Sequence, residues 1–309
     1  MNCLKIVIAM ILASSLLTAA EAAKVPGVPG VPAVLEPLKA KIDARHYFFK
    51  GPTLQFRAEE PITEEQWKAI GELGIRNIGA GGKCMDDAAI ARLAKLDPEG
   101  LSLDGSEITD DGCKHLAEMK SLKLLSVGHA TLGKNGFKGT GLAALKAVPT
   151  LEKFTFGGSS ASDAAMEAIG ELTQLKEFAS WHTQRTQAGN LPLVKLTNLK
   201  TLTIGQSLYG WDGKPRNYAL DDSTLATIAK ITSLENLTLM EARFTFAALE
   251  QLKALTNLKS LRFDNADVSP ADAEKLRALL PSVKIIYTPL TDEQRAKLDK
   301  SLSDPSVKK

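Results

Sequence analysis

Residues 101–116 read Leu101-Ser-Leu-Asp-Gly105-Ser-Glu-Ile108-Thr-Asp110-Asp-Gly-Cys-Lys-His-Leu116 and contain one copy of a recurring unit. The first half alternates apolar and polar residues, which is typical of a strand. Similar segments centre on Leu54, Ile78, Leu101, Leu125, Phe154, Phe178, Leu202, Leu237, Leu261 and Ile286. These centres lie 24, 23, 24, 29, 24, 24, 35, 24 and 25 residues apart, so the chain is a repeat array with a period of about 24 residues.

A second pattern, with apolar residues three apart, lies between the strand segments and predicts one short helix per repeat, as in Ile90/Leu93/Leu96. Helix start signals precede several of these stripes, namely Thr63 with Gln66, Thr109-Asp110, Ser162-Asp163 and Ser269-Pro270. A unit of one strand and one helix is too small to bury its own apolar face. Neighbouring units must therefore stack into a continuous α/β solenoid.

These motifs resemble the leucine-rich repeat family, in particular its ribonuclease-inhibitor-like class and the secreted bacterial arrays. The resemblance covers residues 52–288. It implies a curved horseshoe with about ten parallel strands on the concave side and helices on the convex side. One departure is that the asparagine of the general family motif is replaced by Lys83, Ser106, Ala130, Ser159, Thr183, Ser207, Ala242 and Ala266.

The ends of the chain differ from the array. Lys5, the apolar run 6–17 and the small residues before position 23 predict a secretory signal peptide at 1–23, so we expect an exported protein that is periplasmic, cell-surface associated or secreted. The apolar run would span about 18 Å, too little for a bilayer core of about 30 Å. The other expected segments are a Val-Pro-Gly spacer at 24–34, an amino-terminal cap at 35–51, the repeat domain at 52–288, and a carboxyl-terminal cap helix and tail at 289–309.

Composition narrows the classes of function. The net charge of +2 gives no general attraction to nucleic acid or to an anionic membrane. Three cysteines and four histidines in 309 residues argue against a disulfide scaffold or a zinc ribbon. We therefore expect no nucleic-acid partner and no membrane span, and a monomer.

Alternation along each strand places the residues between the motif leucines on the concave face. Most of these residues are small and uncharged, and Trp181 stands out as the only aromatic residue among them. Exposed aromatic residues with polar neighbours are typical of interface anchors, although a tryptophan can also close a gap between loops. The candidate binding residues in this part of the face are Trp181, His182, His129, Met240, Arg262 and Asp264.

Two insertions lie between a strand and the following helix, about five residues within 128–140 and about eleven within 206–220, since those repeats span 29 and 35 residues. The second insertion adds three further candidates, Tyr209, Trp211 and Arg216. Loops on one edge of a repeat array often form its binding face, but tolerated drift in loop length is the alternative.

Catalysis fits poorly, and we predict no enzyme, no cofactor and no metal site. His129 and His182 are two repeats apart, roughly 10 Å, which is too far to share one zinc ion. Ser159 lies in a serine-rich turn with no histidine nearby in the repeat. Cys113 takes an inward helix position, and a disulfide with Cys84 is disfavoured by their repeat positions.

The sequence thus predicts an exported, non-enzymatic module that binds a partner protein through its concave face and the edge formed by the strand-to-helix loops. Recognition of a cell-envelope glycan or peptidoglycan fragment, and a structural surface role, remain alternatives.

Overall fold

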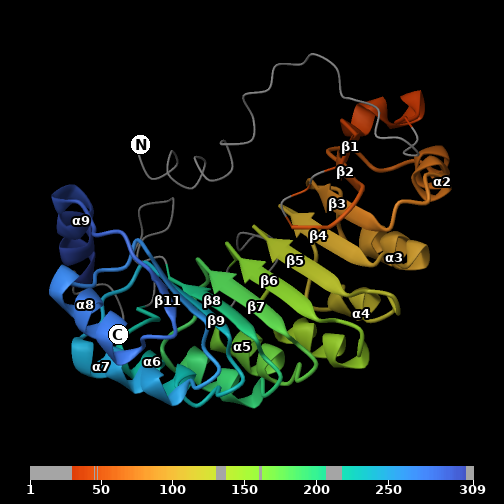
Figure 1. The fold of residues 1–309 in the computed structure, drawn as a ribbon. Helices are drawn as coiled ribbons and strands as arrows, with labels where there is room; N and C mark the ends of the chain where they lie inside the picture. The colour runs from red at the N-terminus through yellow and green to blue at the C-terminus, as the bar shows by residue number, and fades with distance from the viewer. Residues whose placement is uncertain are drawn as a thin grey trace.

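The computed structural model describes residues 30–44, 46, 48–129, 137–159, 162–206 and 218–303. These residues form an open, curved array with strands along the inner, concave side and helices along the outer, convex side (Figure 1). The predicted α/β leucine-rich repeat solenoid is confirmed by this arrangement. No helix within the described ranges is long and apolar enough to cross a bilayer.

Eleven strands form one sheet in chain order. They are β1 (Lys41–Asp43), β2 (Thr53–Arg57), β3 (Asn77–Gly81), β4 (Gly100–Asp104), β5 (Leu124–Gly128), β6 (Lys153–Gly157), β7 (Glu177–Trp181), β8 (Thr201–Gly205), β9 (Asn236–Met240), β10 (Ser260–Asp264) and β11 (Lys284–Ile286). All neighbours from β2 to β11 pair parallel, which gives the ten expected strands, whereas β1 pairs antiparallel with β2.

The sheet register aligns the strand centres from Leu54 to Leu261 as the period predicts. The last predicted centre, Ile286, is wrong by one residue, because Leu261 pairs with Ile285. Two adjacent isoleucines in a strand of three residues give no alternation that could select between them.

The convex elements are η1 (Ala33–Leu38), α2 (Glu64–Glu72), α3 (Asp87–Leu96), α4 (Cys113–Leu116), η2 (Thr140–Ala147), α5 (Asp163–Gly170), η3 (Ala188–Lys195), α6 (Asp222–Ile228), α7 (Phe246–Glu250), η4 (Gln251–Ala254), α8 (Pro270–Leu279) and, at the carboxyl end, α9 (Asp292–Ser303). Those labelled η are 3₁₀ helices, so the expected α-helix is replaced in some repeats. In η3, Pro192 lacks the N–H that an α-helix would use.

Two of the four predicted helix starts hold as caps. Thr63 and Gln66 form a capping box, and the Ser269 side chain accepts from the Asp272 amide. Ser162 is the N-cap of α5, but its side chain makes no cap bond. After Thr109-Asp110 the chain turns once more before α4 begins, with Gly112 as its N-cap.

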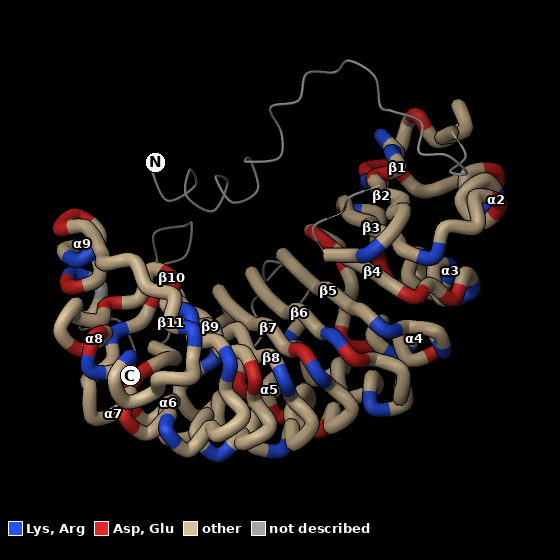
Figure 2. The backbone as a smooth tube through the Cα atoms, in the orientation of Figure 1, with Lys and Arg blue, Asp and Glu red and all other residues tan. Residues whose placement is uncertain are grey.

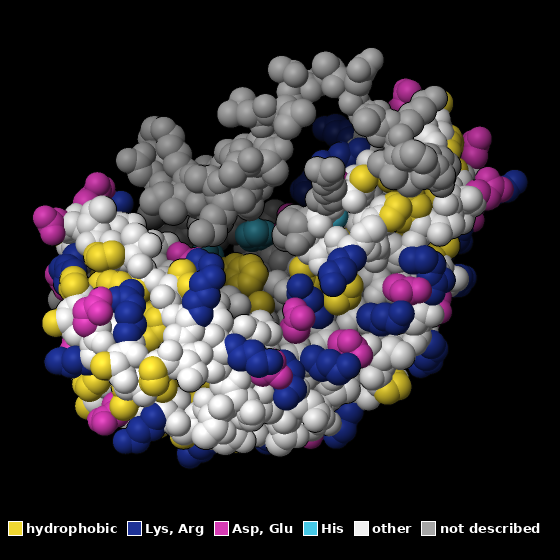
Figure 3. Space-filling view, viewed as in Figure 1, with side chains coloured by type: hydrophobic (Ala, Val, Ile, Leu, Met, Phe, Trp, Pro, Cys, Tyr) yellow, Lys and Arg dark blue, Asp and Glu magenta, His cyan; other side chains and the backbone are white. Residues whose placement is uncertain are grey.

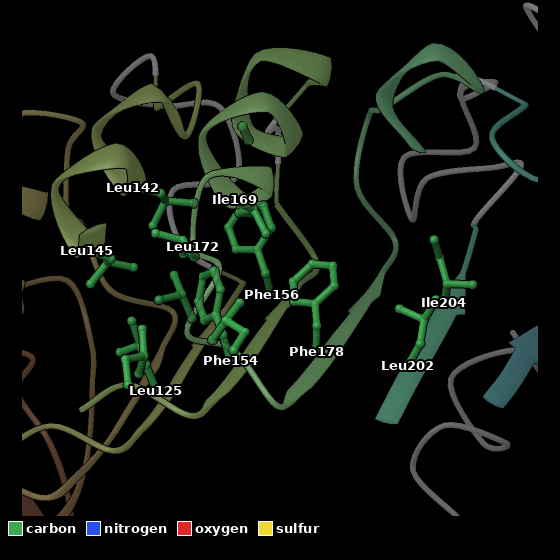
Figure 4. Packing of buried hydrophobic residues seen from close by; sticks show 14 of the residues in the cluster. Leu125, Leu142, Leu145, Phe154, Phe156, Ile169, Leu172, Phe178, Leu202 and Ile204 are labelled. Carbon is green, nitrogen blue, oxygen red and sulfur yellow. The ribbon is translucent and has the colours of Figure 1, made fainter. Parts of the chain in front are cut away.

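One continuous core runs between the sheet and the convex elements. Phe154, Phe156 and Phe178 are 0–1% exposed and lie beneath Ile169 of α5 and Leu172, which follows that helix (Figure 4). The Phe154 ring centroid is 5.8 Å from that of Phe156 and 6.0 Å from that of Phe178. Aromatic rings on neighbouring strands thus fill the middle of the array.

Neighbouring repeats are joined by aspartate–threonine pairs that stand in for the missing asparagines. Asp163 at the start of α5 accepts from the backbone amide of Thr186 (2.6 Å) and from its hydroxyl (2.7 Å), one repeat further on. Asp87 and Thr109 repeat this double bond, and so do Asp222 and Thr245. Each such pair ties the first turn of one helix to the start of the next.

The edge of the sheet where the strands begin carries alternating charges (Figure 2). Glu99 lies between Arg76 (3.6 Å) and Lys123 (2.9 Å), and Glu235 lies between Lys200 (3.4 Å) and Lys259. Bonds from lysines on both sides lower the pKa of Glu235. This edge is therefore neutralised within the molecule.

Helix α9 lies against the strand-to-helix loops of the last repeats. Arg243 bonds to Asp299 at 2.6 Å, and Arg295 lies 3.1 Å from Asp267. In addition, Leu298 and Leu302 of α9 pack against Tyr218, which lies just before α6 in the chain. The predicted terminal helix is present, and it extends over three repeats.

Candidate functional site

The candidate site lies along the carboxyl ends of the parallel strands, which we call the carboxyl-end rim. The last residues of β2 to β10 are Arg57, Gly81, Asp104, Gly128, Gly157, Trp181, Gly205, Met240 and Asp264. Larger side chains are therefore interspersed with glycines, and several of the larger ones lie over a neighbouring glycine. Figure 3 shows histidine and hydrophobic side chains together in the hollow of the molecule.

Trp181 is half-buried and lies over Gly157, its register partner on β6. A Cβ atom added to Gly157 would lie 3.1 Å from Trp181 Cε2 and 3.2 Å from Nε1. On the other side, a Cβ added to Gly205 would lie 2.9 Å from Met240 Cβ and 3.2 Å from Trp181 Cβ. The two glycines leave the room that Trp181 and Met240 occupy.

His129 lies on the amino-terminal side of Trp181. Its Nδ1 atom is 2.7 Å from Asp104 Oδ1, and this bond raises the pKa of the imidazole above its ordinary value of 6.5. A Cβ added to Gly158 would lie 2.6 Å from His129 Cδ2. His129 and Trp181 thus lie over adjacent residues, Gly158 and Gly157.

His182 lies on the other side of Trp181 and reaches across β8. Its Nε2 atom is 3.3 Å from Glu241 Oε1, the residue after β9. The structure therefore brings His129, Trp181, His182 and Met240 together on the rim, and it adds two carboxylates, Asp104 and Glu241, that sequence reasoning did not single out.

The backbone of the rim is unusual at the residue that follows each strand. Gly105 and Gly158 adopt positive φ there, and so do His129 (φ 47°), His182 (φ 53°) and Glu241 (φ 56°). This left-handed conformation costs a residue with a Cβ roughly 1–2 kcal/mol relative to glycine. Gly82 after β3 and Asn265 (φ 49°) after β10 adopt positive φ as well, so this conformation is a recurring feature of the turn that follows the strands.

Arg185 supports the rim from below and was missed by the sequence reasoning. It is 1% exposed, and it donates to Asn190 Oδ1 (2.9 Å), Ser180 Oγ (3.2 Å), Thr183 Oγ1 (2.8 Å) and the Gly205 carbonyl (2.5 Å). Burial lowers the pKa of its guanidinium to about 10, against the opposing charge of Asp163. The sequence contained one signal that Arg185 is buried: Arg185 takes the position in its repeat that the apolar residue Ile108 takes in an earlier repeat.

The remaining predicted residues are not part of this cluster. Arg262 is exposed and Asp264 is half-buried on β10, which is three strand spacings or about 14 Å from β7. Tyr209, Trp211 and Arg216 lie outside the described residues.

Charges near Trp181 are largely paired within the molecule. These are the His129–Asp104 and His182–Glu241 pairs, whereas the Lys153–Glu177 pair (3.4 Å between Nζ and Oε2) lies where β6 and β7 begin. Within the described ranges, no group of three or more histidine, cysteine or acidic side chains could hold a metal ion. Cys84 and Cys113 are both free thiols, and burial raises the pKa of Cys113 to about 12.

A separate hollow of about 370 Å³ lies on the convex side between α2 and α3 and is lined by Trp67, Arg92 and Leu96 among others. Trp67 is 7% exposed there, and the Arg92 guanidinium stacks 5.8 Å from its ring. It lies on the opposite, convex side from the concave sheet, and its Arg92 pairs with Glu64 at 2.5 Å.

No protein-family model matches the sequence, and a search of curated proteins found no significant match. Similar solved structures include internalin C2 of Listeria monocytogenes, 16% identical, which covers 73% of this chain and 84% of that one at a TM-score of 0.42. An internalin (inlF) of the same organism is 16% identical, covering 80% and 84%, with a TM-score of 0.38. A Bacteroides fragilis protein is 17% identical, covering 70% and 68%, with a TM-score of 0.42. The leucine-rich repeat architecture of this chain is carried by its own period, sheet register and buried leucines.

Proposed function

We propose that this chain is an exported, non-enzymatic module that recognises a partner protein through its concave sheet and carboxyl-end rim. The observation that carries this proposal is Trp181, a half-buried tryptophan seated on Gly157 between two histidines in left-handed conformations. A large side chain whose position is already fixed loses little entropy on binding, and tryptophan is enriched among the residues that dominate binding energy.

The paired charges of the rim support contact with a partner that is not strongly charged. Because Asp104 and Glu241 each have an imidazole neighbour, they offer little long-range attraction. We expect partner affinity to depend weakly on salt.

The test compares Trp181→Ala with Arg57→Ala, which removes an exposed arginine at the far end of the same rim. Partner capture from an envelope extract should weaken roughly thirtyfold for Trp181→Ala, equivalent to about 2 kcal/mol, and by less than about fivefold for Arg57→Ala. Thermal unfolding measured in parallel should be nearly unchanged in both. Unfolding of Trp181→Ala without selective loss of capture would identify Trp181 as a packing residue.

The same extract distinguishes a protein partner from a glycan. Capture that survives glycosidase treatment and is lost after proteolysis supports a protein partner, whereas the reverse pattern would refute it.

Export has its own test, since it concerns residues 1–23. Mass spectrometry of protein recovered outside the cytoplasm should find an amino terminus at Ala23 or Lys24. Recovery of that protein with Met1 intact would contradict cleavage.

A further inference from the structure

Phe48 and Phe49 lie on the concave face, within the segment 35–51 that the sequence predicts as an amino-terminal cap. The Phe49 ring lies over Gly100, the first residue of β4, where an added Cβ would be 2.7 Å from both Phe49 Cδ1 and Cε1. Phe49 is only 4% exposed. An aromatic side chain from the amino-terminal segment is therefore buried on the inner surface of the sheet.

Contacts on both sides of Phe49 show the path of this segment. Asn77 Nδ2, on β3, donates to the carbonyls of Lys50 (3.1 Å) and Pro52 (3.3 Å). The Phe48 ring centroid lies 4.7 Å from Nζ of Lys153, the first residue of β6. The segment thus runs across the strands, from β3 past β4 toward β6.

The segment forms an aromatic cluster of its own. The His46 and Phe49 rings stack with centroids 4.9 Å apart, and Phe48 meets Phe49 edge-on at 4.9 Å. Burial lowers the pKa of His46, as expected for an enclosed imidazole. His46 and residues 48–50 lie outside the strand pairing of the sheet, because β1 ends at Asp43 and β2 begins at Thr53.

The pocket beneath Phe49 is specific to one strand. Among the ten parallel strands, β4 is the one that begins with glycine, and the others begin with residues that carry side chains. Removing the Cβ at this single position opens the space that the ring fills. The pocket lies where the strands begin, whereas Trp181 lies where they end, so the two surfaces are distinct.

We propose that the pocket over Gly100 is a docking site for an extended, aromatic segment of a partner protein, and that Phe48 and Phe49 are its resident intramolecular occupant. The chemistry of the partner follows from the occupant, which presents two adjacent phenylalanines followed by a lysine. Phe49 shows that the pocket accepts a phenyl ring, and Asn77 shows how the pocket fixes the backbone that follows it. This proposal goes beyond the function of the rim and stands without it.

A tethered occupant competes strongly with a free one, because its effective concentration is in the millimolar range. Apparent affinity for a free segment falls in proportion to the fraction of molecules whose pocket is open. Removing the two phenylalanine rings of the occupant should therefore raise the affinity of the chain for an added segment.

The probe is a fluorescein-labelled synthetic peptide of residues 44–51, ARHYFFKG, and fluorescence anisotropy measures its binding to the full chain. The Phe48→Ala/Phe49→Ala chain should bind this peptide at least about tenfold more tightly than the wild type. Adding Gly100→Ala to that variant should abolish this gain in affinity for the peptide. Gly79→Ala is the matched control, because its added Cβ would meet Gln55 Cγ at an ordinary 3.4 Å, and it should keep the gain.

Equal peptide affinity in the wild type and the double variant would overturn the proposal, and so would a gain that survives Gly100→Ala. Phe48→Ala alone provides a second variant in case the double variant does not fold, since Phe48 is only half-buried. It should give an intermediate gain, and no gain would count against the proposal. A wild-type dimer in sedimentation that dissociates on Phe49→Ala would assign the pocket to a second copy instead.

Discussion

Trp181 and Gly157 face each other in register on neighbouring strands, and the indole of Trp181 folds back over the bare backbone of Gly157. The glycine is part of the site, because a methyl group in its place would meet both the ring and the Trp181 carbonyl oxygen at 3.1–3.2 Å. The orientation of the candidate anchor is thus set by a residue with no side chain.

Gly157→Ala should displace the Trp181 ring while leaving the fold intact, because the clash is confined to one side chain and one carbonyl. Chains labelled with 5-fluorotryptophan have three fluorine resonances, one for each tryptophan, and Trp181→Phe assigns the relevant one. We expect Gly157→Ala to shift that resonance. Gly128→Ala is the control on the adjacent strand, since its added Cβ would approach Asp104 Oδ1 at 3.4 Å, and identical spectra for both variants would contradict the packing described here.

Asp163→Ala should destabilise the array by about 2 kcal/mol, because it leaves the amide and hydroxyl of Thr186 without their charged acceptor. Asp222→Ala removes the equivalent pair with Thr245 at an exposed position and should cost about 1 kcal/mol. Urea unfolding monitored by circular dichroism measures both values. Equal losses would show that burial of the pair does not matter.

Arg185→Met should cost about 3 kcal/mol or more, because it leaves Asn190, Thr183 and the Gly205 carbonyl buried without their donor. Arg185→Lys keeps a charge but lacks the planar fork, so we expect an intermediate loss in the same urea experiment. A methionine variant as stable as the wild type would mean that the site can close around an apolar chain.

The His129–Asp104 pair should make a small contribution to stability that depends on pH. Because the folded pKa of His129 is raised, the contribution is fully present below the unfolded pKa of about 6.5 and is lost as pH rises through the folded value. Asp104→Asn should lower the His129 pKa toward its ordinary value. Proton NMR titration of the four histidines, with His129→Gln for assignment, checks this; an unchanged pKa would show that Asp104 is not the cause.

The repeat itself was predictable because each strand centre is fixed by two requirements, alternation along the strand and a period of about 24 residues. Where one requirement fails, prediction fails: at β11 the adjacent Ile285 and Ile286 provide no alternation, and the assigned centre was off by one. The concave positions of Trp181 and Met240 followed from the same alternation and agree with the structure.

Other features depend on contacts that have no periodic signature. Phe49 meets Gly100 across 51 residues, and His182 meets Glu241 across 59, so neither pair could be derived from spacing. Arg185 is buried at a position where the repeat otherwise holds an apolar residue, and a charged residue is expected at the surface unless its bonding partners are known. The partners that make its burial tolerable come from three separate segments of the chain.

Helix α9 has a practical consequence for work with this protein. It returns the carboxyl end of the described chain to Tyr218, beside the loops that border the rim. A purification tag or surface linker attached beyond Ser303 would therefore begin next to the surface under study and could obstruct it. The opposite end is a better handle, because η1 is held against α2 on the outer side of the array, where Gln66 Nε2 donates to the Val34 carbonyl at 3.2 Å.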